Sequence, residues 1–297
     1  MRSWLPTILF LVWLPILAAC GPPGDSGYRG ILYFIQGSYL MRYDLRDGAL
    51  SAVTNLGNKQ IREISPFGEN RLLISETTSV NRKRVAQISW MDLDTGRSES
   101  LYPGVRARYL PDAGAIVYDD GRRLYSVAVV DDVETNTMLL AHRLNEVSAM
   151  VSIPGGRLLL AIRQAGKEEI HLFDIRTNQL DRLDALTRAC RLEGAVWISD
   201  EDKLACPARH PECAGASYVL ADLLGAVCRP IDLPEGGSFT ALTFLEGQGA
   251  LILKELWKSR FSEQKKAALW AHDIATGENV RLSEYKNLGA SVVYAER

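Results

Sequence analysis

Short runs of apolar residues alternate with tight turns along most of the chain. Beyond residue 30 the runs are rich in Val, Ile, Leu, Tyr and Phe, and residues such as Gly, Pro, Asp and Asn cluster between them. Runs of this kind, bounded by such turn residues, are typical of β-strands joined as hairpins. The pattern therefore predicts an all-β protein.

One turn element recurs at a nearly constant spacing. It begins with an aspartate and an apolar residue and in most copies ends, four residues after the aspartate, with glycine or asparagine; the copies are 44–48, 92–96, 174–178, 222–225 (one residue shorter) and 273–277. The spacing averages about 46 residues if one degraded copy lies near 124–129. Glycine or asparagine supplies a positive φ in such a turn, and the aspartate side chain caps the turn backbone. We interpret each copy as a hairpin turn.

A second turn-rich element precedes every copy after the first, including the degraded one, at 64–75, 110–119, 153–162, 198–207 and 245–254. Each places a tight turn rich in Pro, Gly or Asp between two apolar runs, which indicates another hairpin. One repeat unit therefore contains four short strands, lettered a to d in chain order. A four-stranded unit of roughly 40 to 50 residues is characteristic of a β-propeller blade.

The two ends of the repeat region complement each other. The chain enters at 30–36, which matches a strand b, and it ends at 288–297 with a strand that has no b, c or d after it. We expect this last strand to serve as strand a of blade 1, which closes the ring and removes exposed strand edges. The sequence thus predicts a six-bladed propeller of four-stranded antiparallel blades over residues 31–297.

Two of the turns resemble those of a known family. Ser65-Pro66-Phe67-Gly68 follows a strand a, and 92–96 follows a strand c, where TolB-like propellers carry their SPDG and DxxTG turns. The resemblance extends over nearly all of the repeat region and implies the same six-bladed fold. TolB itself has an α/β domain before its propeller, and this sequence lacks a counterpart. The shared motifs are structural turns, so the resemblance implies a fold and leaves the activity open.

The first 19 residues differ from the rest in composition. One basic residue, Arg2, precedes an apolar run of about fifteen residues (5–19), which is short for a membrane span of about twenty residues and contains two prolines. A basic start, a short apolar region and small residues at its end are typical of a secretory signal peptide. We predict that residues 1–19 are removed.

Residues 17–20, Leu-Ala-Ala-Cys, resemble the lipobox of bacterial lipoproteins. The resemblance implies that Cys20 becomes the lipidated N-terminus and that residues 20–30 form a flexible tether; ordinary cleavage with an incidental Cys20 is the alternative. Several acyl chains on one cysteine give stable membrane anchoring. Gly21 stands where inner-membrane lipoproteins usually carry aspartate, which implies an outer-membrane location facing the periplasm.

Composition narrows the classes of partner. The sequence has 34 basic and 36 acidic residues. A chain with a net charge so close to zero is not typical of a nucleic-acid-binding protein.

Four further cysteines lie close together in the sequence: Cys190, Cys206, Cys213 and Cys228. An exported protein is in a compartment that permits disulfides. We expect Cys206 and Cys213 to form a disulfide across the b–c turn of blade 5, with Cys190–Cys213 as the rival pairing and Cys228 unassigned. His210 between the two cysteines raises the possibility of zinc, but this spacing is not that of a familiar zinc site.

Motifs for catalysis are scarce. The chain has no G-x-S-x-G nucleophile elbow, no H-E-x-x-H, no EF-hand loop and no phosphate-binding glycine loop. Single histidines (His142, His171 and His272) and Trp90, Trp197 and Trp270 fall in expected strands, and the acidic pairs 119–120 and 131–132 fall in expected solvated turns. We therefore expect no cofactor, no metal and no enzymatic activity.

A basic and aromatic segment stands out in the loop between strands b and c of blade 6. It contains Trp257, Lys258, Arg260 and Phe261, and the matching loop of blade 2 contains Arg82 and Arg84. Exposed aromatic residues beside arginine are enriched in protein-binding hot spots. We interpret these six residues as a partner-binding surface; the alternative is that Trp257 and Phe261 extend strand b and pack between blades.

The sequence thus favours a non-catalytic, lipid-anchored propeller that scaffolds or recruits another protein of the bacterial cell envelope. One alternative is a six-bladed hydrolase or lactonase with a channel metal, for which Glu63, Glu146 and Glu193 are scattered candidates. Another is a propeller that binds a small ligand or glycan at the channel mouth. Three or more carboxylates converging on the channel would favour the enzyme.

Overall fold

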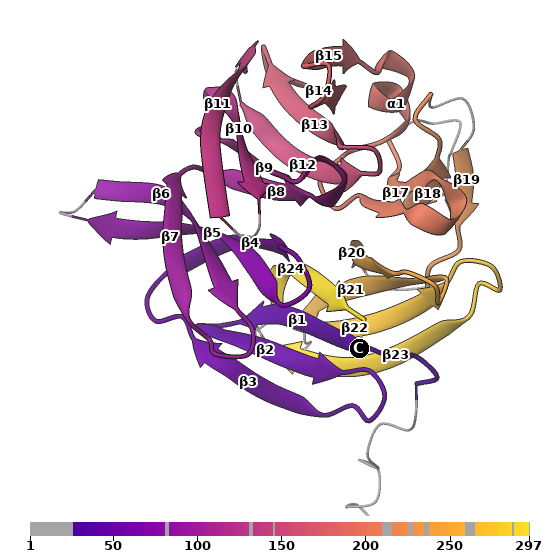
Figure 1. The fold of residues 1–297 in the computed structure, drawn as a ribbon. Helices are drawn as coiled ribbons and strands as arrows, with labels where there is room; N and C mark the ends of the chain where they lie inside the picture. Colours follow the sequence, from indigo (N-terminus) through magenta and orange to yellow (C-terminus); the bar gives the residue numbers. More distant parts are fainter. Residues whose placement is uncertain are drawn as a thin grey trace, which may run out of the picture.

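In the computed structural model the chain forms six four-stranded antiparallel sheets arranged in a ring (Figure 1). The innermost strands of the ring line a central channel. The structure describes residues 26–80, 83–130, 133–144, 146–209, 216–224, 228–234, 238–258, 265–286 and 288–296. The prediction of a six-bladed propeller is confirmed.

The strands of each blade are given from the channel outward. Blade 1 contains β24 (Leu288–Ala295), β1 (Ile31–Gln36), β2 (Tyr39–Asp44) and β3 (Leu50–Asn55); blade 2 contains β4 (Gln60–Pro66), β5 (Arg71–Val80), β6 (Lys83–Asp92) and β7 (Ser98–Pro103); blade 3 contains β8 (Arg106–Leu110), β9 (Ala115–Asp119), β10 (Arg123–Val130) and β11 (Val133–Arg143). Blade 4 contains β12 (Val147–Ile153), β13 (Arg157–Gln164), β14 (Lys167–Asp174) and β15 (Gln179–Arg182); blade 5 contains β16 (Val196–Ile198), β17 (Lys203–Pro207), β18 (Tyr218–Ala221) and β19 (Cys228–Ile231); blade 6 contains β20 (Ser238–Leu245), β21 (Ala250–Lys258), β22 (Lys265–Asp273) and β23 (Asn279–Lys286).

The ring closes through the last strand, as the sequence predicts. β24 pairs antiparallel with β1, in a register that joins Ile31 to Ala295 and Phe34 to Val292. The Lys254 ammonium group of blade 6 donates hydrogen bonds to the carbonyl oxygens of Leu288 and Gly289, at 2.8 and 2.9 Å. The first residues of the closing strand are therefore also held from the neighbouring blade.

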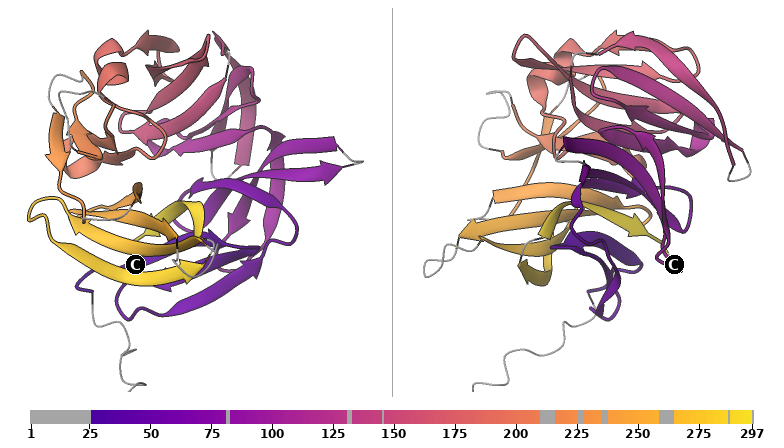
Figure 2. Two further views of the ribbon diagram at one scale, coloured as in Figure 1. Left: turned by 180° about the vertical axis from the view of Figure 1, so that it is seen from behind. Right: turned by 90° about the vertical axis from the view of Figure 1, so that its left-hand side faces the viewer.

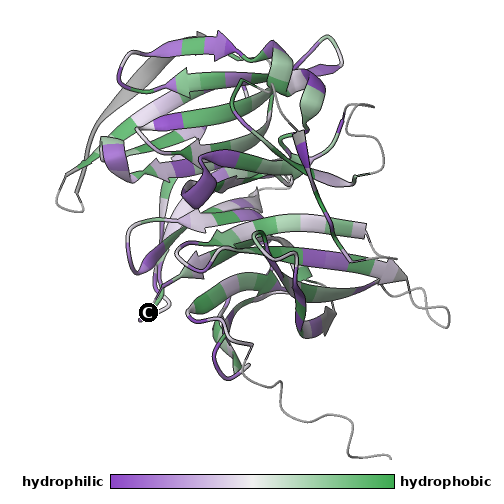
Figure 3. Cartoon of the chain, turned by 90° about the vertical axis from the view of Figure 1, so that its right-hand side faces the viewer, coloured by the Kyte–Doolittle hydropathy of each residue, from purple (hydrophilic) through white to green (hydrophobic). Residues whose placement is uncertain are grey.

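Hydrophobic cores lie between successive blades. One core joins Leu32 and Phe34 of blade 1 to Ile252 and Leu269 of blade 6, and five further cores repeat the arrangement around the ring. In a strand, successive side chains point to opposite faces, so one strand can supply both neighbouring cores. Apolar residues accordingly predominate along the strands, and hydrophilic residues are frequent in the turns (Figure 3).

The predicted aspartate turns have the expected geometry. Gly96 and Gly277 have φ values of 67° and 75° and donate to the carbonyl oxygens of Asp92 and Asp273. Each aspartate also accepts from a threonine amide three residues later, at 2.7 Å. These hydrogen bonds stabilise the ionised form and lower the pKa of both carboxyl groups.

The connections divide the molecule into two faces. The a–b and c–d turns lie on one side, here called the a–b face, and the b–c and d–a connections lie on the other, the b–c face. Two views of the ribbon show that some hairpins extend farther from the body of the propeller than others (Figure 2). The strands of the β5–β6 and β21–β22 hairpins have nine or ten residues, whereas β1 and β2 have six each.

Three short helices interrupt the strands among the described residues: η1 (Pro111–Ala113), α1 (Asp184–Ala189) and η2 (Ser199–Glu201). Helix α1 lies in the connection between blades 4 and 5, where the sequence pattern did not predict a helix. It buries Leu186 and Ala189 in the core between these blades. No helix in the described ranges is long and apolar enough to cross a membrane.

The predicted Cys206–Cys213 disulfide is wrong in the structure. Cys206 is bonded to Cys190, with a Cα–Cα distance of 5.8 Å. Helix α1 is the reason, because it returns the chain so that Cys190 forms a β-bridge with Ala208 beside β17. Cys213 lies outside the described residues; Cys228 is the first residue of β19.

The end of the expected flexible tether is already attached to the propeller. Ser26 Oγ donates to the carbonyl oxygen of Leu45, and the backbone amide of Arg29 donates to Gln248 Oε1, both at 2.7 Å. Leu45 follows β2 at a c–d turn, and Gln248 lies in an a–b turn. The chain therefore joins the propeller on the a–b face; Cys20 lies outside the described residues.

Candidate functional site: the central channel

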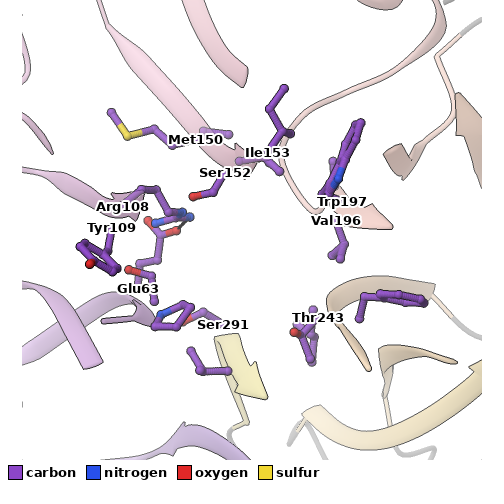
Figure 4. A pocket seen from close by; sticks show the side chains of 18 of the residues that line it. Glu63, Arg108, Tyr109, Met150, Ser152, Ile153, Val196, Trp197, Thr243 and Ser291 are labelled. Carbon is purple, nitrogen blue, oxygen red and sulfur yellow. Dashed lines mark hydrogen bonds and ion pairs between the residues drawn. The ribbon is translucent and has the colours of Figure 1, made fainter. Parts of the chain in front are cut away.

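The inner strands of all six blades line a central cavity of about 810 Å³. Because strand a of each blade runs from the b–c face to the a–b face, residues near its start mark one mouth and residues near its end mark the other. Figure 4 shows the side chains of Glu63 and Arg108 on one wall, with Val196 and Trp197 across the cavity.

Blades 2 and 3 supply the charged wall. Arg62 and Glu63 come from β4, and Arg106, Arg108 and Tyr109 come from β8. The register of β4 shifts between Ile61 and Glu63. A bulge of this kind interrupts the alternation of side chains, so that consecutive residues line the same cavity.

The guanidinium groups of this wall use some of their N–H donors in ion pairs and hydrogen bonds. Arg108 forms an ion pair with Glu63, and the side chains are 16% and 20% exposed. Burial lowers the pKa of Arg108 to about 10, which leaves it charged at neutral pH. Arg106 donates to the carbonyl oxygen of Val147 in blade 4, and Arg62 Nε donates to Thr77 Oγ1 at 3.0 Å.

Blades 4, 5, 6 and 1 supply a wall of a different character. Its members are small hydroxyl and apolar side chains, among them Ser152, Val196, Thr243, Ser291 and Val293. Ser291 Oγ accepts from the Ile64 amide at 2.9 Å and so bridges blades 1 and 2. The cavity therefore combines one wall that carries three arginines with another whose strands contribute uncharged side chains; Glu193, Glu246 and Glu296 line the ends of this second wall.

Asp119 stands behind the charged wall. It is 1% exposed, and its Oδ2 atom has no hydrogen-bond partner among the described residues. Burial raises its pKa to about 6, although Arg106 and Arg62 oppose the shift. The expectation of a solvated acidic turn is wrong for Asp119, because this residue ends β9 and its side chain is buried. Asp120 is exposed, as expected for a turn, and residues 131–132 lie outside the described residues.

The three candidate carboxylates for a channel metal do not converge. Glu63 is paired with Arg108, Glu146 is paired with Arg163 at 3.4 Å, and Glu193 lines the cavity from blade 5. Within the part of the chain that the structure describes, no group of three or more His, Cys, Asp and Glu side chains could hold a metal ion.

The candidate partner-binding residues lie at the b–c face where the structure describes them. Trp257 is half-buried near the end of β21, and the Arg281 guanidinium lies 5.4 Å from its ring centre. Lys258 ends β21, Arg84 is exposed on β6, and Arg82, Arg260 and Phe261 lie outside the described residues. Sequence reasoning missed the channel arginines, because Arg62 stands beside a bulge and because alternation alone does not reveal which face of β8 is turned to the channel.

The tryptophans and histidines that the sequence placed in strands (Trp90, Trp197, Trp270, His142, His171 and His272) lie in strands. Trp90 packs beside the core between blades 2 and 3 and Trp270 beside the core between blades 5 and 6, where its Nε1 atom donates to Glu255 at 2.9 Å. Trp197 lies partly buried on β16, with Nε1 unpartnered among the described residues. His272 is buried and contacts Asn279.

The arrangement was compared with known proteins. No protein-family model matches the sequence, and no curated protein matches it. Solved structures with a similar fold include a chain of a nidogen/laminin complex (TM-score 0.62, 12% identity, 89% of this chain and 98% of that one) and TolB from Acinetobacter baumannii (TM-score 0.57, 16% identity, 94% and 69%). A puromycin-hydrolyzing peptidase from Mycobacterium tuberculosis has a TM-score of 0.56 at 14% identity, over 86% of this chain and 44% of that one.

The fold defines the class of protein: a six-bladed β-propeller, a fold that TolB shares. At such low identities they show the fold alone. A shared propeller fold supports many functions, so activity has to be argued from the site.

Proposed function

We propose that this protein is a non-catalytic propeller of the bacterial cell envelope, anchored by a lipid on Cys20, which binds another envelope protein through its b–c face. One observation carries the proposal: the chain joins the propeller on the a–b face, opposite the long β5–β6 and β21–β22 hairpins. Binding residues are often found on loops held by a rigid frame.

The direction of the anchor supports this orientation. Cys20 precedes Ser26 by six residues, and Ser26 is fixed to the c–d turn of blade 1. Six residues span at most about 20 Å when extended. A lipid on Cys20 would therefore keep the a–b face near the membrane and leave the b–c face available to a partner.

The b–c face also presents apolar side chains beside positive charge. Tyr39, at the short b–c turn of blade 1, is 45% exposed, and Val85 of β6 is 39% exposed. Arg84 is exposed next to Val85, and Trp257 is half-buried on the hairpin that flanks blade 1 on its other side. Tyrosine, tryptophan and arginine are the residues that most often dominate protein-binding energy.

Site-specific photo-crosslinking in intact cells tests the proposal. A photoreactive amino acid at Arg84 or Tyr39 samples the b–c face, and the same amino acid at the exposed Ala275 samples the a–b face. We expect one discrete protein adduct from the first two positions and none of that mass from Ala275. Equal adducts from both faces, or none from the b–c face, would contradict the proposal.

A matched pair of tryptophan variants separates binding from folding. Trp257→Ala should abolish the adduct at Arg84 while lowering the free energy of unfolding by only about 1–2 kcal/mol, because it removes a half-buried ring and its cation–π contact with Arg281. Trp270→Ala should cost several kcal/mol, since it removes a large ring and its hydrogen bond from beside the core. Thermal unfolding of both variants checks the assignment.

A further inference from the structure

The charges that line the central channel are distributed unevenly along its axis. Near the b–c mouth and at mid-channel, blades 2 and 3 place Arg62, Arg106 and Arg108 against Glu63, with Asp119 buried behind them. The guanidinium groups are thus gathered on blades 2 and 3, and Glu193, which precedes β16, faces them from blade 5 at the same b–c end. At the a–b mouth the charged lining residues are Asp112, Glu246 and Glu296, which follow the ends of β8, β20 and β24.

The three guanidinium groups retain unused donors. Each arginine has five N–H donors in a planar fork. Arg62 and Arg106 each make one hydrogen bond to a described residue, and Arg108 makes two, to Glu63 and to the carbonyl oxygen of Ala107. The remaining donors suit the planar or tetrahedral oxygens of a carboxylate or phosphate, which arginine binds with paired hydrogen bonds.

The opposite wall suits the rest of such a molecule. Val151, Val196, Leu242 and Val293 contribute apolar surface to the cavity, and the Ser152 and Thr243 hydroxyl groups have no partner among the described residues. A cavity of about 810 Å³ is within the range of small-molecule sites, which combine apolar walls with a few polar groups. Figure 4 shows Ser152, Thr243 and Ser291 between the Arg108 wall and the Trp197 wall.

We propose that the channel binds a small organic anion, with its carboxylate or phosphate group on Arg108 and Arg106 and its apolar body against the walls of blades 4, 5, 6 and 1. Glu63 competes with the ligand for Arg108. Three carboxylates at the a–b mouth, against Glu193 and the arginines at the other end, repel an anion more strongly, so the ligand enters from the b–c face.

Binding of simple probes to the purified soluble propeller, residues 26–297, tests this inference once circular dichroism and a cooperative thermal transition show that this part folds. Phenyl phosphate and benzoate carry both a charge and an apolar body, benzyl alcohol lacks the charge, and inorganic phosphate lacks the body. By isothermal titration at low ionic strength, we expect saturable binding of phenyl phosphate, benzoate or both, at least about tenfold tighter than benzyl alcohol and inorganic phosphate. The stronger of the two identifies the preferred head group.

Variants that are expected to change the affinity in opposite directions show whether the probe binds at the channel arginines. Arg108→Gln should weaken binding of the preferred probe by about tenfold or more, and Arg106→Gln should weaken it in the same direction. Glu63→Gln should strengthen binding, because it frees Arg108 and removes a negative charge. Arg163→Gln, which removes an arginine paired with Glu146 outside the cavity lining, should leave the affinity unchanged.

Three results would overturn the inference: no saturable binding of either aromatic anion at about 10 mM, a weak-binding limit; equal affinity for benzyl alcohol; or equal losses in Arg108→Gln and Arg163→Gln. If Arg108→Gln fails to fold, the Arg106→Gln and Glu63→Gln pair decides the outcome. The photo-crosslinking result is independent of this test, so the proposed partner binding and the channel site can fail separately.

Discussion

Asp119 shows how burial sets the charge of one residue in the wall behind the channel. Its raised pKa means that the folded protein holds a proton more tightly than the unfolded chain does. The free energy of unfolding therefore falls as pH rises from about 4 to about 6, and the penalty persists at higher pH. A shift from 3.8 to about 6 corresponds to about 3 kcal/mol, at about 1.36 kcal/mol per pKa unit.

Asp119→Asn should consequently stabilise the protein by about 2–3 kcal/mol at pH 7.5, with the gain disappearing toward pH 4. An asparagine oxygen can still accept the hydrogen bond from the Gly121 amide. Asp120→Asn is the matched control: hydrogen bonds from the Arg122 and Arg123 amides lower the pKa of Asp120, so this change should destabilise at neutral pH. Urea unfolding between pH 4 and 8 measures both; parallel curves for Asp119→Asn and the wild type would contradict the prediction.

The Cys190–Cys206 disulfide is a second feature that depends on single residues. It closes a loop with a sequence separation of 16 residues, for which the chain-entropy model gives about 3 kcal/mol. Cys206→Ala should lower the free energy of unfolding by about this amount, and Cys213→Ser should leave the Cys190–Cys206 link in place. Peptide mapping without reduction checks the pairing, and a Cys206–Cys213 peptide would refute it.

At the scale of elements, a feature could be predicted from the sequence where the residues that determine it are close together along the chain. The aspartate turns and the strands between them follow from residues close in sequence, and they define the blades correctly. The Cys190–Cys206 pairing depends on helix α1, which brings together segments separated in sequence, so loop spacing did not reveal it. In hindsight, Asp184 in the first turn and Arg188 in the last turn of α1 are weak helix signals.

The channel wall was beyond sequence reasoning for a related reason. A shift of one residue in a strand moves its side chains to the other face. The bulge at Ile61–Glu63 decides that both Arg62 and Glu63 line the cavity. Arg108 contacts Glu63 because β8 and β4 are neighbours around the ring. The repeat pattern predicts that the two strands are neighbours, but it does not predict how far along the channel axis each residue lies.

The closing strand can be tested as an element. Truncation after Lys286 removes β24 and exposes an edge of β1, so we expect aggregation or loss of cooperative unfolding. Lys254→Met removes the two hydrogen bonds to Leu288 and Gly289 and should destabilise by about 1–3 kcal/mol. Lys266→Met on the adjacent β22 serves as the matched control and should change stability little. Thermal scans give both values; a soluble truncation of unchanged stability would show that closure through β24 is dispensable.

For the whole molecule, the proposed lipid anchor on Cys20 would determine where the propeller acts. Lipidation of Cys20 predicts that the mature protein begins at this residue and that its intact mass exceeds the mass of residues 20–297 by the mass of the acyl groups. Cys20→Ser should block this modification, and the variant should no longer be recovered as a processed membrane protein. Mass spectrometry of membrane extracts measures the outcome. A Cys20→Ser protein that is still processed and still membrane-bound would exclude the lipid anchor.

The position of β1 within blade 1 has a mechanical consequence. The N-terminal segment leads directly into β1, which is paired on one side with β2 and on the other with β24. A force applied through the N-terminus is therefore shared between two ladders of hydrogen bonds, one formed by the beginning of the propeller and one by its end. Pulling out β1 would require both ladders to break, and with them the closure of the ring. A protein held at its N-terminus thus resists a pull with a strand that is paired along both of its edges.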